Sequence, residues 1–80
     1  MKSLTLRQLR YLDAVATHRH FGRAAEACSI SQPALSNQIK ELESLANAPL
    51  VERDSRNVHL TPLGEAFVSR ARAILASVDE

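Results

Sequence analysis

Four polar residues occur at a spacing that places them on one side of a helix. They are Gln32, Ser36, Asn37 and Lys40. Leu35 and Ile39 would occupy the opposite, apolar side. Glutamine and asparagine can form paired hydrogen bonds with adenine, serine can donate or accept, and lysine can reach phosphate or guanine. The residues alone leave two interpretations open: a surface that reads base edges in double-stranded DNA, or an ordinary solvated helix face.

A second candidate group is a pair of arginines, Arg53 and Arg56, that bracket a turn. The segment 54–57 supplies turn-forming residues and contains no large apolar side chain. Arginines on such a projection can enter the minor groove of DNA or hold phosphates. The competing interpretation for Arg53 is a surface ion pair with Glu52 or Asp54, which would add little stability.

Catalytic and metal-binding sites are not predicted. His18, His20 and His59 do not share a ligand spacing with the single cysteine or with acidic residues. A chain with only two glycines has no glycine-rich phosphate loop, and no nucleophile can be paired with a base and an orienting acid. We therefore expect no enzyme activity, no metal and no cofactor. Cys28 falls on an apolar helical face with Phe21, which predicts a buried structural thiol.

The composition sets the class of protein. A chain of 80 residues with 45% hydrophobic and 24% charged residues is typical of one small globular domain, neither disordered nor membrane-spanning. The net charge of +1 does not by itself indicate a nucleic-acid partner. The first residues lead directly into a charged amphipathic segment, and one cysteine cannot form an internal disulfide. These features favour a cytoplasmic protein with no membrane partner.

Three helices are predicted in the first part of the chain. The first covers about 6–17, and Thr5 provides its capping box. The second is short, starts near Phe21 and has Gly22 as an acceptable N-cap. The third begins after Ser31 as N-cap and ends at Asn47, which is suited to the left-handed conformation.

The connection between the second and third helices is only about three residues long, 29–31. Ala24 and Ala25 allow the two helices to approach closely. A short turn between close helices predicts a helix-turn-helix over about 21–40. In that motif the second helix lies in the major groove, with its N-terminal residues facing base edges.

The pattern changes after Pro49. Two strand-like runs, 50–53 and 57–60, predict a β-hairpin at about 50–60 that packs on the helices as a wing. We therefore predict a mainly α fold with a small β-hairpin: a winged helix-turn-helix domain at 4–61, followed by a long helix at 62–80.

The last helix begins with Thr61 as N-cap and Pro62 at its first position. Gly64 weakens its first turn slightly. Apolar residues then recur at spacings of three or four, as in a coiled-coil seam that pairs two chains. The predicted dimerisation residues are Leu63, Phe67, Ala71, Ile74 and Val78. A second row, formed by Val68, Ala71 and Leu75, widens the seam.

A spaced set of short segments covers nearly the whole chain. The segments are 9–12, 21–26, 30–36, 38–39, 42–43, 49–50, 52–53, 60–62 and 64–65. This set resembles the N-terminal DNA-binding domain of the LysR-type transcriptional regulators. The chain departs from the usual family pattern at Ala46-Asn47, where Leu-Gly is common, at Val51, where Phe is common, and at Asn37, where Arg is common. These differences concern three features: the end of the third helix, which would be the recognition helix in the major groove, the packing of the wing, and the base that residue 37 would prefer.

The resemblance implies a bacterial homodimer that binds an interrupted palindrome in double-stranded DNA. It assigns base contacts to Gln32, Pro33, Ser36 and Asn37. It assigns backbone contacts to Thr5, Arg23, Ser31 and Lys40. It places Arg53 and Arg56 on the wing and makes the last helix the linker helix that pairs two subunits.

Typical family members continue into a larger effector-binding domain, which is absent from this sequence. A small-molecule or redox effector would act only through that domain, and a full-length protein would form a tetramer. The segment 18–21 together with Cys28 resembles the hydrogen-peroxide-sensing subgroup. Because the sensing cysteines of that subgroup belong to the effector domain, Cys28 is not assigned a sensor role. The alternative function is a helical interaction or dimerisation module that does not bind DNA.

Overall fold

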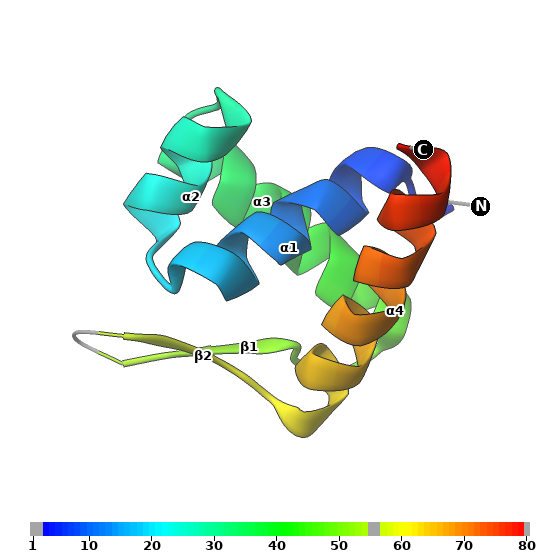
Figure 1. Ribbon diagram of the computed structural model, residues 1–80. Coiled ribbons are helices and arrows are strands. Elements are labelled where there is room, and N and C mark those ends of the chain that lie inside the picture. Colours follow the sequence, from blue (N-terminus) through cyan, green and yellow to red (C-terminus); the bar gives the residue numbers. More distant parts are fainter. Residues whose placement is uncertain (1–2, 55–56, 80) are drawn as a thin grey trace.

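The computed structural model describes residues 3–54 and 57–79. Over those ranges the elements are α1 (Leu6–His18), α2 (Phe21–Cys28), α3 (Gln32–Ala46), β1 (Val51–Arg53), β2 (Val58–Leu60) and α4 (Pro62–Val78). Figure 1 shows the hairpin extending along one edge of the helical body, away from α4. The predicted mainly α architecture with one small hairpin is confirmed. Within the described ranges, no helix combines the length and apolar character needed to cross a bilayer.

Three helices begin where the capping residues predict. Thr5 and Gln8 form a complete capping box at α1, and the Ser31 hydroxyl accepts a hydrogen bond from the Ala34 amide (3.2 Å). The Thr61 hydroxyl does the same for the Gly64 amide (3.0 Å). Each cap satisfies an amide that has no partner inside its helix. The short-range sequence signals therefore fix these starts.

The prediction of Gly22 as N-cap of α2 is wrong. The N-cap is His20, whose Nδ1 accepts a hydrogen bond from the Arg23 amide (3.1 Å). Arg19 ends α1 in the left-handed conformation, with φ 51°. Because that residue reverses the chain direction, the extended residue before the next helix is His20, and Gly22 already lies inside α2.

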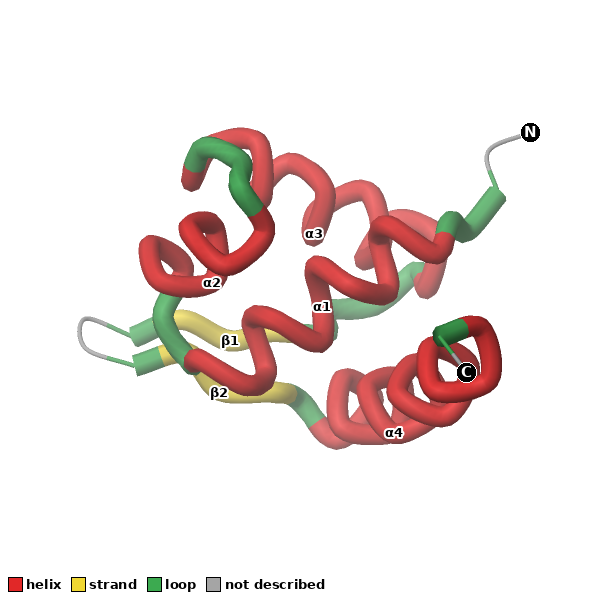
Figure 2. Tube along the Cα trace, turned by 45° about the horizontal axis from the view of Figure 1, so that its top comes forward, coloured by secondary structure: helices red, strands yellow, loops and turns green. Residues whose placement is uncertain are grey.

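The core forms around α1, which contacts α2, α3, α4 and β2. Leu12 and Val15 of α1 are fully buried together with Leu35 and Leu42 of α3 and Leu50 at the start of the hairpin. In Figure 2, α1 crosses the molecule between the α2–α3 pair and α4. This central helix therefore sets the positions of the other three.

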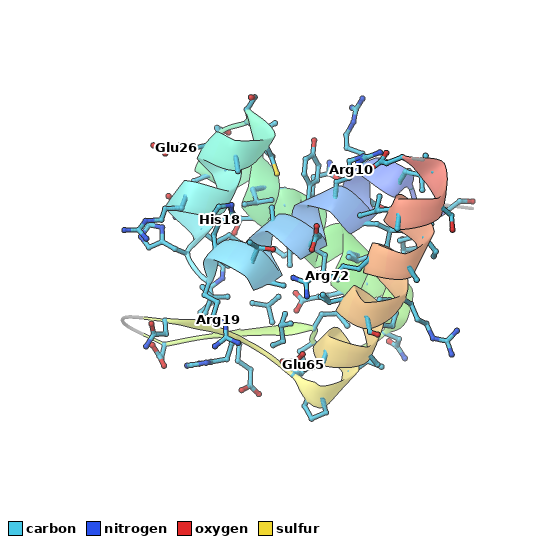
Figure 3. The ribbon with its side chains drawn as sticks, in the orientation of Figure 1. Arg10, His18, Arg19, Glu26, Glu65 and Arg72 are labelled. Atoms are coloured by element: carbon cyan, nitrogen blue, oxygen red, sulfur yellow. The ribbon has the colours of Figure 1, made fainter. Side chains whose placement is uncertain are left out.

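Helix α4 is held against α1 by an apolar row and by ion pairs. Val68, Ala71 and Leu75 are buried, and Ala71 and Leu75 form a separate small cluster with Leu9 of α1. Arg72 Nε lies 2.7 Å from Asp13 Oδ1 in α1. Arg10 pairs with Asp79 through two hydrogen bonds of 2.8 and 3.0 Å. Figure 3 shows Arg10 and Arg72 at this junction of the two helices.

The predicted seam of α4 is divided in the structure. Leu63, Ile74 and Val78 are exposed and Phe67 is half-buried, whereas Ala71 is only 1% exposed. Ala71 lies beneath α1 because the helix turns its second row, 68–71–75, toward the body of the chain. Of the predicted seam, Leu63, Phe67, Ile74 and Val78 therefore remain accessible and Ala71 does not.

The base of the hairpin is fixed by contacts from two helices. The strands are antiparallel, with Val51 opposite Leu60. From α3, Glu43 Oε2 accepts hydrogen bonds from the amides of Leu50 (2.8 Å) and Val51 (3.2 Å). From the other side, the Thr61 amide donates to the Leu50 carbonyl oxygen (3.0 Å). The hairpin thus has a defined position although it has only two short strands.

Gly64 is packed directly against this base. A Cβ at Gly64 would lie well inside contact distance of the Leu50 carbonyl oxygen and 2.9 Å from the Leu50 carbonyl carbon. The Thr61 hydroxyl also donates to the Pro49 carbonyl oxygen (2.8 Å). The start of α4 therefore approaches the backbone at 49–50 so closely that no side chain fits between them.

Glu43→Gln is expected to lower the free energy of unfolding by about 1.5–3 kcal/mol, because two hydrogen bonds to a half-buried carboxylate lose their charge assistance. Urea unfolding of the variant and of Ser44→Ala, which changes an exposed neighbour, measures the difference. Equal stability of the two variants would show that Glu43 does not hold the hairpin.

Candidate nucleic-acid interface

The predicted base contacts, which we call the recognition face, lie in the N-terminal half of α3. Gln32, Pro33 and Asn37 are exposed, and Ser36 is half-buried beside the hairpin. Leu35, Ile39 and Leu42 are buried on the opposite side of the same helix. The fold therefore separates the polar face from the core, as the spacing predicts, and leaves the polar side chains accessible.

The first turns of α2 and α3 lie close together. A Cβ at Gly22 would be 3.6 Å from Gln32 Oε1, so the Gln32 side chain reaches the start of α2. The turn between the helices is short because Ser29 adopts the left-handed conformation, with φ 58°. Arg23, a predicted backbone contact, is exposed on α2. The helix-turn-helix arrangement predicted from the connection length is present.

Arg53 connects the hairpin to both helices of this motif. Its guanidinium carbon lies 3.7 Å from the centroid of the Phe21 ring at the start of α2. Its Nη2 donates a hydrogen bond to Ser36 Oγ on α3. Sequence reasoning placed Arg53 on the wing and considered ion pairs with Glu52 or Asp54, but it did not find Phe21 or Ser36. The only sequence signal for the contact with Phe21 was that an arginine and an aromatic residue can stack.

The described flanks of the hairpin turn are joined by hydrogen bonds. The Asp54 amide donates to the Asn57 carbonyl oxygen (3.1 Å), and the Asn57 amide donates to Asp54 Oδ1 (2.7 Å). His59 Nε2 lies 3.3 Å from Asp54 Oδ2. The predicted wing residue Arg56 lies outside the described residues.

A polar contact that sequence reasoning missed ties α1 to α3. Gln8 is buried, and its Nε2 lies 3.3 Å from Glu41 Oε2 and 3.4 Å from Gln38 Oε1. Its Oε1 accepts from the Thr5 amide (3.1 Å). The only sequence signal was the role of Gln8 in the capping box. Through this contact, the start of α1 is held against α3, together with its N-cap Thr5, a predicted backbone contact.

The remaining predicted backbone contacts are accessible on α3 and at its start. Lys40 is exposed, and Ser31 is exposed while its hydroxyl oxygen caps α3. The first amides of a helix, together with its positive dipole end, favour a phosphate. Ser31 and Lys40 are therefore placed so that an anionic backbone could meet them.

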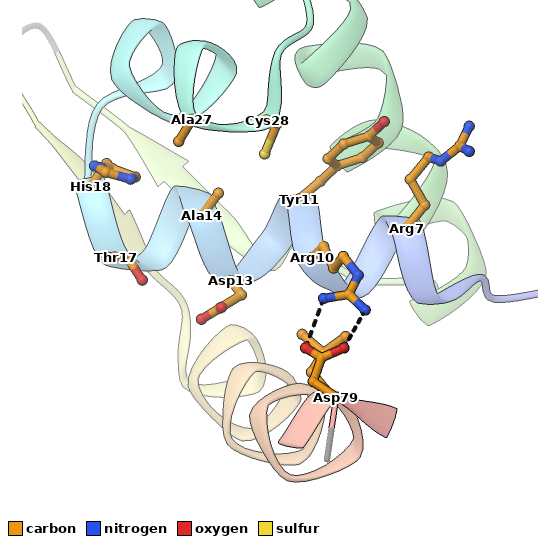
Figure 4. Close-up of a pocket in the computed structure, with 11 residues that line it drawn as sticks. Arg7, Arg10, Tyr11, Asp13, Ala14, Thr17, His18, Ala27, Cys28 and Asp79 are labelled. Carbon is orange, nitrogen blue, oxygen red and sulfur yellow. Dashed lines mark hydrogen bonds and ion pairs between the residues drawn. The ribbon is translucent and has the colours of Figure 1, made fainter. Parts of the chain in front are cut away.

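Cys28 is half-buried rather than buried as predicted, because it is the last residue of α2 and lies at the edge of the core. It lines a pocket of about 530 Å³ that also contains Arg7, Arg10 and Asp79 (Figure 4). Burial, and then the negative charge of Asp13, raise the pKa of the Cys28 thiol. Both effects disfavour the thiolate, which is the nucleophilic form of cysteine. In the described part of the chain, no three His, Cys, Asp or Glu side chains gather as metal ligands.

Comparison with known proteins gives a consistent match. Residues 6–65 match the family model described as "Bacterial regulatory helix-turn-helix protein, lysR family". The HTH-type transcriptional regulator BudR of Klebsiella aerogenes is 55% identical over 76 residues, which cover 95% of this chain and 53% of BudR. The DNA-binding transcriptional dual regulator OxyR of Escherichia coli (strain K12) is 48% identical over 75 residues, which cover 94% of this chain and 25% of OxyR.

Solved structures agree with the sequence matches. The BenM DNA-binding domain in complex with catB site 1 DNA superposes with a TM-score of 0.91 at 43% identity, covering 95% of this chain and 85% of that one. The fold is thus a winged helix-turn-helix. The chain spans about half the length of BudR and a quarter of the length of OxyR.

Proposed function

Because the chain belongs to the LysR family of bacterial regulatory helix-turn-helix proteins, we propose that it reads a specific site in double-stranded DNA to control transcription. The observation that carries the proposal is the exposed polar face of α3, which lies beside α2 in helix-turn-helix geometry. The regulatory names of the relatives and the DNA in the BenM complex support it. The alternative, an interaction module without DNA binding, leaves this polar face unexplained.

The proposed contacts follow the placement of the side chains. Base edges in the major groove are met by the first turns of α3, through the exposed Gln32, Pro33 and Asn37 and the half-buried Ser36. Thr5, Arg23, Ser31 and Lys40 meet the DNA backbone. On the wing, Arg56, from the sequence, reaches the minor groove or phosphates, and Arg53 lies where the wing meets α3.

The proposed active form is a homodimer on an interrupted palindrome. Residues 4–61 form the DNA-binding unit and α4 is the linker helix, whose exposed row of Leu63, Phe67, Ile74 and Val78 meets the same row of a second copy. Two joined units place two recognition helices one helical turn of DNA, or more, apart. An effector would bind a separate domain that these 80 residues do not include.

Selection of bound sequences from a random pool of duplex DNA, at a defined salt concentration, tests the function directly. An enriched half-site repeated in inverted orientation is expected. Failure to enrich any sequence would overturn DNA reading and favour the interaction module.

Gln32→Ala and Asn37→Ala are each expected to cost about 1–3 kcal/mol of discrimination at one base position, because a paired hydrogen bond to a base is lost. Titration of single-base variants of the selected site measures this loss. Ser44→Ala, at an exposed position near the end of α3, is the control and should change no base preference. Equal weakening at every base position would reassign Gln32 and Asn37 to backbone contacts.

A further inference from the structure

Arg53 is held from two sides at the junction of hairpin and recognition helix. The Phe21 ring beneath its guanidinium is only 5% exposed and belongs to the core, so it offers a fixed platform. Stacking on an aromatic face restrains the plane of the guanidinium and leaves its N–H groups directed outward along that plane. One of these groups, on Nη2, donates to Ser36 Oγ.

This hydrogen bond has a consequence for the chemistry of Ser36. A serine hydroxyl has one hydrogen to donate and two lone pairs to accept with. The Arg53 cation uses one lone pair and has no acceptor for the hydroxyl hydrogen. The hydrogen of Ser36 is therefore directed away from Arg53 and can reach another acceptor. The hydroxyl thus keeps its donor and loses half of its accepting capacity.

We propose that Arg53 is a positioning residue for base reading: it fixes the Ser36 hydroxyl as a hydrogen-bond donor toward the DNA bases. This inference rests on the proposed function. In the major groove, guanine presents N7 and O6, thymine presents O4 and adenine presents N7 as acceptors, whereas cytosine presents an amino donor. A fixed donor at Ser36 therefore disfavours cytosine at the base that this residue reads. Strand β1 thereby contributes to specificity through a residue of α3.

A direct phosphate contact by Arg53 would have a different signature. Loss of one phosphate contact weakens binding to all sequences alike and reduces the salt dependence by about one ion. Loss of a positioning contact changes the preference at one base pair only. Affinities for DNA sites that differ at single bases therefore distinguish a phosphate contact by Arg53 from a positioning role.

The test is a double-mutant cycle with wild type, Arg53→Met, Ser36→Ala and the double variant. Methionine keeps an apolar stem on Phe21 but has no donor. The half-site selected by the wild type is changed one base at a time, and the base pair read by Ser36 is the one whose preference Ser36→Ala abolishes. The measured quantity is the ratio of affinities for the selected base and for cytosine at that pair, at one salt concentration.

Arg53→Met is expected to lower this ratio about fivefold at the Ser36 pair and less than about twofold at other pairs. In the Ser36→Ala background the same change should alter the ratio by less than about twofold, because no hydroxyl remains to be positioned. Arg53→Lys should restore the overall affinity and its salt dependence without restoring the full ratio, since an ammonium cannot stack and donate with the geometry of a planar guanidinium.

Two outcomes overturn the inference separately from the proposed function. Equal weakening at all base pairs, with the same size in both backgrounds, would make Arg53 a phosphate contact only. A fivefold change at the Ser36 pair that persists in the Ser36→Ala background would show that Arg53 reads the base without Ser36. A wild type that selects no sequence at all would overturn the proposed function, and this inference with it.

Discussion

Gly64→Ala is expected to lower the free energy of unfolding by about 3 kcal/mol or more, which corresponds to a fall of about 12 °C or more in the melting temperature. The added methyl group would overlap the backbone carbonyl of Leu50. A carbonyl at the base of the hairpin cannot move without breaking its hydrogen bond with the Thr61 amide. Alanine is the better helix former by about 1 kcal/mol, so the steric overlap alone gives the change its sign.

Gly22→Ala is the matched control, because it adds the same methyl group inside another helix. The nearest atom there is His20 Cε1 at 2.9 Å, at the far end of an exposed side chain that can rotate away. The gain in helix propensity and the weakened His20 cap offset each other to within about 1 kcal/mol. Thermal unfolding compares both variants. A Gly64→Ala protein as stable as Gly22→Ala would contradict the close packing of α4 on the hairpin.

Ile74→Lys is expected to convert the proposed dimer to monomers and to weaken binding to a DNA site with two half-sites about 100-fold or more. In a dimer, binding of one unit raises the effective concentration of the other at its half-site, and monomers lose this advantage. Ile74 is 43% exposed in the single chain, so lysine is tolerated there without disturbing the core. In a dimer the same position would bury an unpaired ammonium beside Arg70, which also borders the groove at Leu4 and Phe67.

Ala76→Lys provides the control for this experiment. It adds the same charge to an exposed position of α4, away from the row of Leu63, Phe67, Ile74 and Val78. Sedimentation velocity and DNA titration are measured for both variants. The added positive charge favours DNA binding in both variants. A loss of DNA affinity that occurs only in Ile74→Lys is therefore due to the disrupted dimer interface. A wild-type chain that stays monomeric at high concentration and on DNA would refute the dimer.

The regular elements of this protein were predictable because their signals are local. Thr5, Ser31 and Thr61 cap helices through bonds to amides three residues away, and Asn47 takes the left-handed conformation that its side chain favours. The start of α2 was not predictable in the same way. Its cap is a histidine, which is not a preferred N-cap residue, and the left-handed residue before it is an arginine.

The candidate site was predictable in its residues but not in their connections. The spacing of Gln32, Ser36 and Asn37 against Leu35 and Ile39 determined which face of α3 is polar, since helical periodicity is independent of the rest of the chain. The contact of Arg53 with Ser36 joins residues 17 apart in the sequence, and periodicity carries no information over such a distance.

The sequence by itself thus determined where α1, α3 and α4 begin and which side of α3 is polar, but not where α2 begins. The tertiary structure alone decided which partners the polar side chains of α3 have. It turned Ala71 toward α1, leaving Ile74 and Val78 exposed, and it made Gly64 a point of backbone contact rather than a weak helix residue. The physical reason is that capping and periodicity act within a few residues, whereas close packing depends on segments that only the folded chain brings together.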